Sequence, residues 1–465
     1  MVKGAIKKRK LIPPSHSVRG VKVAQVDAQT ERSKLMFDPY LTSIHRFVRV
    51  LVDNLAFSYE HFMRYSYRDD ESGDEGHTTN RTTKPKRRMK DQDRANLHAM
   101  LMAVISNLAL SAAHGTRPPS VGVMLRSSRD KVTRYHRPAF TGLPKLLDNL
   151  AKAEVGFKLI RSVTKGISSA LVANAALEET LGRFAFGMDD FQRIEGSETV
   201  WLSRKKHDYI LKTHTTELID YRDTPETIRY RAEMQTINEA LKAADLTLNG
   251  SPIPTTSRQL RRHFSLPKDA PEGAERFDLG GRLFGGRWLD LKKLERKGIR
   301  VAGEANVELD FSSLFLRLAY LEAGVTPPKG DLYAAVQGFS EPQWRDGVKR
   351  VVNALFFRST PLSRVPEDAK ELLPSKTTGT AIRGAILAAH PALASVIERG
   401  LGLSFMFVES QILVAALLRL AAQGVPVLPI HDGILCAKSK AAIVHEAMSE
   451  ASMQITGFYL PISMR

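Results

Sequence analysis

The sequence predicts an α+β fold, in which a C-terminal part of strands and helices, residues 277–465, follows a mainly helical and basic accessory region. Apolar residues recur at helical spacing in residues 36–67, 91–113 and 225–246, which predicts helices there. From residue 277 onward, glycines separate short apolar stretches that alternate between strand-like and helical patterns. With 43% hydrophobic and 25% charged residues, the 465-residue chain has the composition of a globular protein of two or three domains.

The charge balance favours a polyanionic partner. The chain has 68 Lys and Arg residues against 50 Asp and Glu residues, a formal net charge of +18. Nucleic acid explains such a surplus best, because basic side chains that neutralise phosphates release condensed counterions. The alternative is a basic protein whose charge only keeps it in solution. A membrane surface is disfavoured, because the sequence has no basic amphipathic helix.

Cysteine usage and targeting signals narrow the class of protein further. Cys436 is the one cysteine of the chain, which excludes a disulfide framework and a cysteine-rich zinc site. The longest apolar stretch, residues 99–113, falls short of the ~18 residues of a membrane span. The first residues lack the apolar segment of a secretory signal. We therefore expect a cytoplasmic protein without a membrane partner.

Composition divides the chain ahead of residue 277 into three segments. Residues 1–34 carry nine lysines and arginines and predict a flexible basic arm. Residues 35–206 predict an accessory nucleic-acid-binding region, within which an acidic block followed by a basic block predicts a mobile charged loop at 68–92. Residues 207–276 predict a helical linker or thumb-like region.

One part of the accessory region has the pattern of a winged helix. Residues 143–151 predict a short amphipathic helix, and residues 155–160 predict a strand after it. Basic residues stand just upstream, at Arg126, Arg129, Lys131, Arg134 and Arg137. A winged helix would place this helix on DNA, and the alternative is an ordinary α+β connection with no binding role.

Two aspartates end apolar strands in the C-terminal part. Asp310 follows Val-Glu-Leu and precedes a predicted helix, and Asp432 lies in a His-Asp-Gly turn of a hairpin predicted at 425–437. Each has a simple structural alternative, a helix N-cap for Asp310 and an Asp-Gly turn for Asp432. Carboxylates at adjacent strand ends repel each other unless cations lie between them. The pair therefore predicts a site for two-metal phosphoryl chemistry.

A basic helix face lies between the two aspartates in the sequence. Four residues follow one another in steps of four, Arg345, Lys349, Asn353 and Phe357. Such steps place side chains on one slowly turning helix face. The arginine and lysine would bind triphosphate oxygens, and the phenylalanine would lie beside the base or sugar. The alternative is the solvated face of an ordinary amphipathic helix.

With these features in order, residues 277–465 resemble the palm and fingers of family A DNA polymerases and of the related single-subunit phage RNA polymerases. Residues 308–317, in which Asp310 is followed by Phe-Ser, resemble the family's motif A. Residues 429–433, Pro-Ile-His-Asp-Gly, resemble its motif C. The resemblance implies a right-hand polymerase palm with reduced fingers.

Three further elements carry the same resemblance. Arg345, Lys349 and Phe357 keep the spacing of motif B on the fingers helix. Residues 330–333 resemble a short element between motifs A and B. Residues 280–285 resemble the segment whose arginine contacts the primer–template duplex.

The resemblance also implies site residues and cofactors. It implies two Mg²⁺ ions, with Mn²⁺ as the expected substitute, and their ligands would be Asp310, Asp432 and the carbonyl of Phe311. Lys349 would join the two aspartates as a catalytic residue. The nucleotide would be bound by Arg345, Lys349, Asn353, Phe357 and Phe315. Nucleic acid would be bound by Arg282, Arg287, Arg317 and His431. The alternatives are that Arg282 and Arg317 support the site and that His431 only shapes the turn.

Three departures from the family pattern bear on the substrate. Asn353 stands where DNA polymerases of the family usually have an aromatic residue. Phe315 replaces the usual sugar-sensing glutamate, and Phe357 replaces a tyrosine and so lacks its hydroxyl. A bulky Phe315 would crowd a 2′-hydroxyl and Phe357 cannot hydrogen-bond to one, which favours deoxynucleotides.

The expected function is a compact family A-like DNA polymerase that adds dNTPs to the 3′-hydroxyl of a DNA primer–template in a bacterial or phage-infected cell. One alternative is an RNA polymerase or primase of the same superfamily, with RNA as a partner. Another is a non-catalytic DNA-binding replication or regulatory protein. His431-Asp432 is also the central dipeptide of HD phosphohydrolases, but no matching upstream histidine accompanies it.

Overall fold

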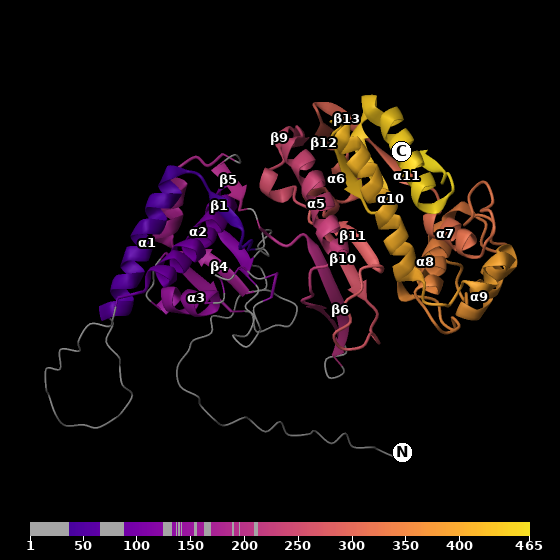
Figure 1. Ribbon diagram of the computed structural model, residues 1–465, viewed down its shortest axis with the longest axis horizontal. Helices are drawn as coiled ribbons and strands as arrows, with labels where there is room; N and C mark the ends of the chain where they lie inside the picture. Colours follow the sequence, from indigo (N-terminus) through magenta and orange to yellow (C-terminus); the bar gives the residue numbers. More distant parts are fainter. Residues whose placement is uncertain are drawn as a thin grey trace, which may run out of the picture.

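The chain is a mixed α+β protein, as predicted (Figure 1). A computed structural model describes residues 37–65, 88–123, 133–135, 137, 140, 142–152, 156–161, 169–187, 190–194, 196–208 and 213–465. The predicted arm at 1–34 lies outside the described residues, as does most of the predicted loop at 68–92. Three of the basic residues of the predicted winged helix also lie outside them, Arg126, Arg129 and Lys131.

Two long helices form the frame of the N-terminal part, α1 (Arg46–Tyr65) and α2 (Asp91–Ala113), which pack side by side (Figure 1). The central helix α2 is apolar on most sides because other elements cover it, and Val104 is fully buried. Two small antiparallel sheets complete this part, one of order β2-β4-β3 and one that pairs β1 with β5. The remaining elements are β1 (Leu41–Ser43), β2 (Ser120–Val123), α3 (Leu143–Lys152), β3 (Phe157–Ile160), β4 (Ser169–Ala173), α4 (Ala175–Gly182) and β5 (Phe191–Arg193).

A four-stranded sheet of order β11-β10-β6-β7 lies between the N-terminal part and helix α10 (Figure 1). Its strands are β6 (Val200–Asp208), β7 (Thr213–Leu218), β10 (Arg261–Leu266) and β11 (Gly280–Phe284). In β10, half-buried and buried residues alternate strictly, as expected when one face of a strand packs on a core. Helix α5 (Pro225–Ala243) contacts β6 and β10.

A seven-stranded sheet carries the predicted site. Its order is β14-β15-β13-β12-β8-β9, and β16 pairs with β13 on the remaining side. The strands are β8 (Leu246–Leu248), β9 (Ser251–Pro252), β12 (Ile299–Val301), β13 (Glu304–Phe311), β14 (Val427–Ile430), β15 (Gly433–Ala437) and β16 (Ile462–Met464). The predicted strand at residue 307 and the predicted hairpin at 425–437 are therefore confirmed.

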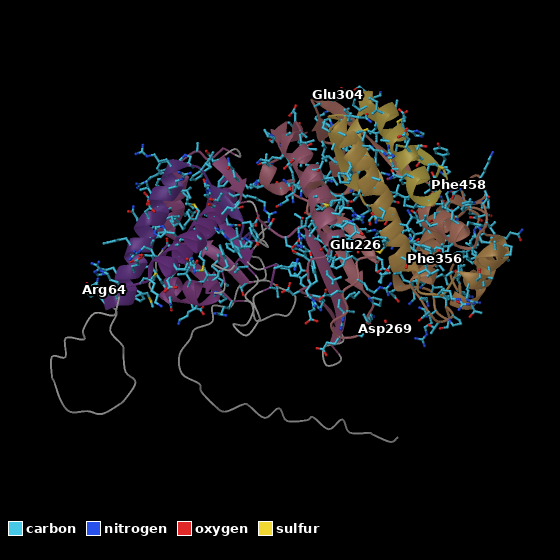
Figure 2. The ribbon with its side chains drawn as sticks, viewed as in Figure 1. Arg64, Glu226, Asp269, Glu304, Phe356 and Phe458 are labelled. Atoms are coloured by element: carbon cyan, nitrogen blue, oxygen red, sulfur yellow. The ribbon has the colours of Figure 1, made fainter. Side chains whose placement is uncertain are left out.

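The helices of the C-terminal part surround this sheet. α10 packs against α5, α7, α11 and β11 and so joins both sheets (Figure 1). Phe356 at the end of α8 packs edge-on against Phe405 of α10, with ring centroids 5.2 Å apart (Figure 2). The helices are α6 (Lys293–Arg296), α7 (Leu314–Glu322), α8 (Arg345–Phe356), α9 (Gly379–Ala389), α10 (Gly402–Ala422) and α11 (Ala441–Thr456). Short 3₁₀ helices span Thr255–Ser257, Arg287–Leu289, Pro342–Trp344, Glu367–Leu372, Pro391–Ser395 and Lys438–Lys440.

The structure adds strands to two predicted segments. Within the described part of residues 35–206, helices α1 to α4 hold more residues than strands β1 to β6, so the segment is mainly helical but also contains short strands. Residues 207–276 contain one long helix, α5, together with strands β7 to β10. Most of these strands have only two to six residues, too few for alternation to stand out from the helical pattern around them. The predicted charged loop also ends earlier, since α2 begins at Asp91.

Within the part of the chain that the structure describes, two helices are long and apolar enough to cross a membrane, α2 and α10, judged by length and composition alone. In their most apolar stretches, 67% of residues in α2 and 50% in α10 are buried inside the protein. The mostly buried core helices of soluble proteins pass the same test, so the finding is weak evidence for a membrane span. The cytoplasmic location stays a prediction.

Candidate active site

Asp310 and Asp432 lie next to each other at one end of the seven-stranded sheet. β13 runs antiparallel to β15, and Asp310 pairs with Gly433. The backbone N–H of Phe311 donates to the carbonyl oxygen of Asp432 at 3.3 Å. The Asp310 carboxylate lies directly over Gly433, because a Cβ built there would be only 2.0 Å from Oδ1 of Asp310. Glycine is therefore required at 433 if the two aspartates are to lie side by side.

Of the two structural alternatives, the N-cap role of Asp310 is wrong and the turn position of Asp432 is confirmed. Asp310 is not the N-cap of α7, since that position is Ser313, in left-handed conformation at φ +53°. The Asp310 carboxylate instead forms an ion pair with Arg465, at 3.2 Å. Asp432 does lie in the turn between β14 and β15, after His431 at φ +40°. The turn places Asp432 at the strand end and leaves its carboxylate available for another role.

The electrostatics of the pair fit a cation site. Burial raises the pKa of Asp310 to about 6, and the charges of Asp432 and Glu308 act in the same direction. Arg465 and Lys349 oppose the shift without cancelling it. A carboxylate held beside a second one in a partly desolvated place is stabilised by a cation between them. Among the described residues, no third acidic, imidazole or thiol side chain joins the pair in a metal-binding cluster.

Helix α8 presents the predicted basic face toward these aspartates. Lys349 is exposed, forms no ion pair with a described residue and acts electrostatically on Asp310. Arg345, in the first turn of α8, forms an ion pair of 2.5 Å with Asp331 and lies over the ring of Tyr333. To bind a triphosphate, Arg345 would have to exchange Asp331 for phosphate oxygens, whereas Lys349 is free to bind one directly.

The predicted nucleotide-binding phenylalanines form one aromatic group. Phe357 follows α8 directly, is 48% exposed and packs on Gly402, where a Cβ would lie 2.5 Å from its ring. Phe315 is only 7% exposed, and its ring centroid lies 6.4 Å from that of Phe357 and 6.0 Å from that of Phe405. Asn353 is half-buried, one helical turn after Lys349. The exposed side of Phe357 is therefore the aromatic surface open to a ligand.

Arg282 is bound to Glu409, a partner that was not predicted for it from the sequence. Its guanidinium forms two hydrogen bonds with the carboxylate of Glu409 on α10, at 2.6 and 3.0 Å, and lies over the Phe315 ring. Glu409 is 2% exposed, and burial raises its pKa to about 7 against the opposing effect of Arg282. The available signal was a lone acidic residue on an otherwise apolar helix, which needs a cationic partner when buried.

Two other residues predicted to contact nucleic acid, His431 and Arg287, lie in different surroundings. His431 is half-buried beside Phe284, and burial and the nearby Arg282 lower its pKa. Its Nδ1 atom has no hydrogen-bond partner among the described residues. Arg287 is exposed on a 3₁₀ helix, and its charge reaches His114 at the end of α2. Both side chains are placed where a ligand could contact them.

Arg317 requires a correction. It is 2% exposed, and its guanidinium donates to the backbone carbonyls of Ser312, Pro328 and Gly330 at 2.7 to 2.8 Å. All its donors point into the protein, so it cannot contact nucleic acid in this conformation. Arg317 instead fixes the chain on both sides of α7, next to Asp310. A guanidinium can bind three carbonyls at once, which a sequence motif does not reveal.

The fold and the paired aspartates define a mixed α+β protein with a candidate cation site. Comparison with protein-family models gives no match to the chain. Comparison with curated proteins gives no sequence of significant similarity. The function is therefore argued from the geometry of the site.

Proposed function

We propose that the protein is a template-directed nucleotidyltransferase, most simply a DNA polymerase with a palm-like seven-stranded sheet. The observation that carries the proposal is the pairing of Asp310 with Gly433, which sets two carboxylates side by side at a strand end. Lys349 acts electrostatically on Asp310 from α8, so a cation site and a phosphate-binding side chain face each other. Phosphoryl transfer needs this combination, because its catalysis rests on positioning and charge neutralisation.

Different side chains would bind the metal ions, the triphosphate and the base. Asp310 and Asp432 would hold two Mg²⁺ ions, which supply Lewis-acid activation of the attacking 3′-hydroxyl and of the leaving oxygens. Lys349 would neutralise the triphosphate as a point charge, and Arg345 would bind it as a fork once released from Asp331. The exposed ring of Phe357 would pack on the base of the incoming nucleotide.

The burial of Phe315 supports a preference for deoxynucleotides. Phe315 is held between Phe357 and Phe405 with the guanidinium of Arg282 over its ring, so the space behind the exposed side of Phe357 is filled by an aromatic side chain that cannot make room for a 2′-hydroxyl. An RNA polymerase or primase would need this space. Comparison of dNTP with NTP incorporation by the unaltered protein separates the two activities.

The test is extension of a labelled DNA primer–template with Mg²⁺. We expect templated dNTP addition by the unaltered protein, and a loss of at least about 10²-fold in Asp310→Ala and Asp432→Ala, since each removes charge that neutralises the reacting phosphates. Asp269→Ala is the matched control, because this exposed aspartate lies far from the site, at the opposite end of the four-stranded sheet (Figure 2).

The other possible results of primer extension would each change or refute the proposal. NTP addition alone would change the proposal to RNA synthesis. Full activity in both aspartate variants would refute it. No incorporation from either nucleotide pool, together with DNA binding, would favour the non-catalytic DNA-binding alternative. One structural observation also supports that alternative. Helix α3 is followed by the antiparallel strands β3 and β4, which is the order predicted for a winged helix.

A further inference from the structure

The face of the four-stranded sheet that points away from α5 carries a row of cationic and aromatic side chains, of which Arg282 on the outermost strand also reaches Glu409 of α10. His263 pairs with Trp201 on one side and with Arg282 on the other, and Arg261 pairs with Phe284. Residues at paired positions of a sheet lie on the same face. The outer row consists of Trp201, Arg261, His263, Arg282 and Phe284, and all five are half-buried.

The outer row is continuous with the candidate active site. The ring centroids of His431 and Phe284 are 6.1 Å apart, and those of Phe284 and His263 are 5.7 Å apart. The next step, from His263 to Trp201, is 5.9 Å. The guanidinium of Arg261 lies 4.2 Å above the Trp201 ring. The row therefore leads from the turn that holds Asp432 across three strands to β6.

Arg261 is a cation without an anion. It forms no ion pair and no hydrogen bond with a described residue, and its Nε atom is buried. Burial, and next the charge of Arg193, lower its pKa. The charges of Asp290 and Asp38 act on it weakly from beyond ion-pair distance. A buried arginine is costly without a counter-charge, which indicates that an anion from outside this part of the chain completes the site.

A cavity of about 50 Å³ lies at this end of the outer row, between the sheet and the N-terminal part. Arg261 and Trp201 line it from the sheet, and Tyr40, Tyr135 and Arg193 line it from the N-terminal part. Stacking surfaces beside guanidinium groups are the usual surroundings of a nucleic-acid strand. The acidic residues nearby are committed elsewhere, since Asp38 pairs with Arg193 at 2.7 Å.

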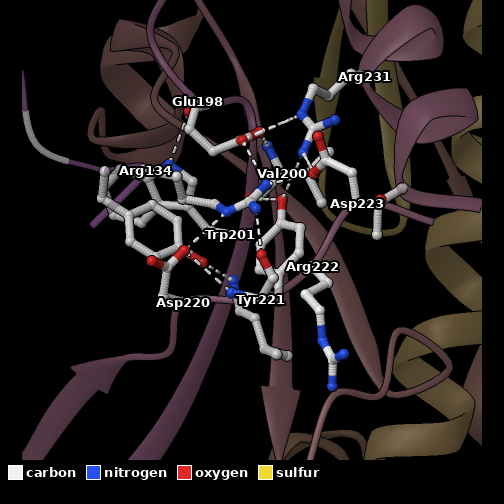
Figure 3. A network of polar contacts seen from close by, with 12 residues as sticks. Arg134, Glu198, Val200, Trp201, Asp220, Tyr221, Arg222, Asp223 and Arg231 are labelled. Carbon is white, nitrogen blue, oxygen red and sulfur yellow. Dashed lines mark hydrogen bonds and ion pairs between the residues drawn. The ribbon is translucent and has the colours of Figure 1, made fainter.

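The N-terminal side of this cavity is held in place by a polar network (Figure 3). Arg134 lies over the Tyr221 ring at 3.6 Å and pairs with Asp220, Asp223 and Glu198 at 3.0, 2.7 and 3.3 Å. Arg231 of α5 pairs with the same Glu198. The acids here are saturated by arginines, so they neither neutralise Arg261 nor repel a phosphate near it.

We propose that the outer row binds the DNA duplex next to the active site, with Arg261 bound to a backbone phosphate and Trp201, near the start of β6, in contact with the same DNA strand. The proposal deepens the function proposed above, because the duplex would be the primer–template. It adds a binding surface that the motifs of residues 277–465 do not contain, since Trp201 and Arg261 lie upstream of them.

The test is binding of a fluorescein-labelled primer–template duplex to the full chain without Mg²⁺, followed by anisotropy between 50 and 200 mM salt. For Arg261→Gln we expect about tenfold weaker binding, and a salt dependence reduced by about one phosphate contact. The matched control is Arg419→Gln, since this arginine of α10 pairs with Glu450 and lies outside the outer row. Thermal unfolding of both variants checks that they are folded.

Tryptophan fluorescence adds a local readout. Of the three tryptophans, Trp288 is fully buried, whereas Trp201 in the outer row and Trp344 beside α8 are half-buried, so duplex binding should quench Trp201 and the substitution of this residue identifies its share. The quenching should be lost in Trp201→Phe. Binding by Arg261→Gln within twofold of the unaltered protein would overturn the proposal, as would equal weakening in Arg419→Gln. Failure of the proposed catalytic function would instead appear as no incorporation by the unaltered protein, or as full activity of Asp432→Ala. Duplex binding by the unaltered protein and by Arg261→Gln can be compared in either case, so the two failures are distinguishable.

Discussion

The two faces of the four-stranded sheet give neighbouring arginines of β10 opposite surroundings. Arg262 points inward, is fully buried and bonds to Glu233 at 3.0 Å, to Gln411 at 3.0 Å and to the hydroxyl of Ser410 at 3.3 Å. Arg261 points outward and has no such partner among the described residues. The inner arginine is therefore part of the structure, and the outer one is available to a ligand.

The largest expected effect is on the inner face. Arg262→Ala should destabilise the protein by about 3–5 kcal/mol, because it leaves Glu233 and the polar groups of α10 without their buried partner. Urea unfolding followed by tryptophan fluorescence measures it. Arg262→Met, which fills the same volume, should cost less than Arg262→Ala. If Arg262→Ala left the free energy of unfolding unchanged, the two faces of the sheet would not differ as described.

A smaller effect is expected from His263 on the outer face. Burial, and next the charge of Arg261, lower its pKa from 6.5 to about 4. The unfolded imidazole takes up a proton below pH 6.5 while the folded one stays neutral, so stability is lost as the pH falls from 6.5 to 4. The loss is up to about 3 kcal/mol. His263→Gln should lack this part of the pH dependence, and parallel unfolding curves at pH 7 and 4 test it.

The smallest effect on stability is expected for Arg261. Arg261→Met should change the free energy of unfolding by about 1 kcal/mol or less, because no partner among the described residues loses a bond. Its effect should appear in duplex binding instead. A destabilisation of Arg261→Met as large as that of Arg262→Ala would show that Arg261 too is a structural residue.

Local pattern predicted the elements around the candidate site well. The strand that ends at Asp310, the helix after it and the hairpin around Asp432 all formed where apolar alternation and turn residues indicated. Their adjacency depends on the antiparallel pairing of β13 with β15, more than 120 positions apart, which only the pattern of motifs suggested. Local signals were sufficient for the elements themselves, because Asp310 is the penultimate residue of β13 and Asp432 lies in the turn directly after the fully apolar strand β14.

The same local signals did not predict which side chains are buried where contacts between distant elements determine the burial. The spacing of residues 225–246 predicts a buried face that includes Ile228, yet Ile228 is 55% exposed and Tyr230 is fully buried. The difference arises because α5 packs on β6, β10 and α10 through Tyr230, Met234, Ile237 and Leu241, a face that leaves Ile228 outside. Likewise, no local signal separates Arg261 from Arg262, since the parallel pairing of β10 with β6 sets which of them points inward.

The network around Arg134 also constrains the order of folding. Its partners Glu198, Asp220 and Asp223 stand 64, 86 and 89 positions further along the chain. During synthesis Arg134 therefore emerges long before the acids that neutralise it. Closing so long a loop gains nothing until both of its ends have formed, because the entropy of the intervening chain opposes it. The join between the N-terminal part and the sheet can consequently form only after Asp223 has been synthesised, later than the local contacts of the N-terminal part.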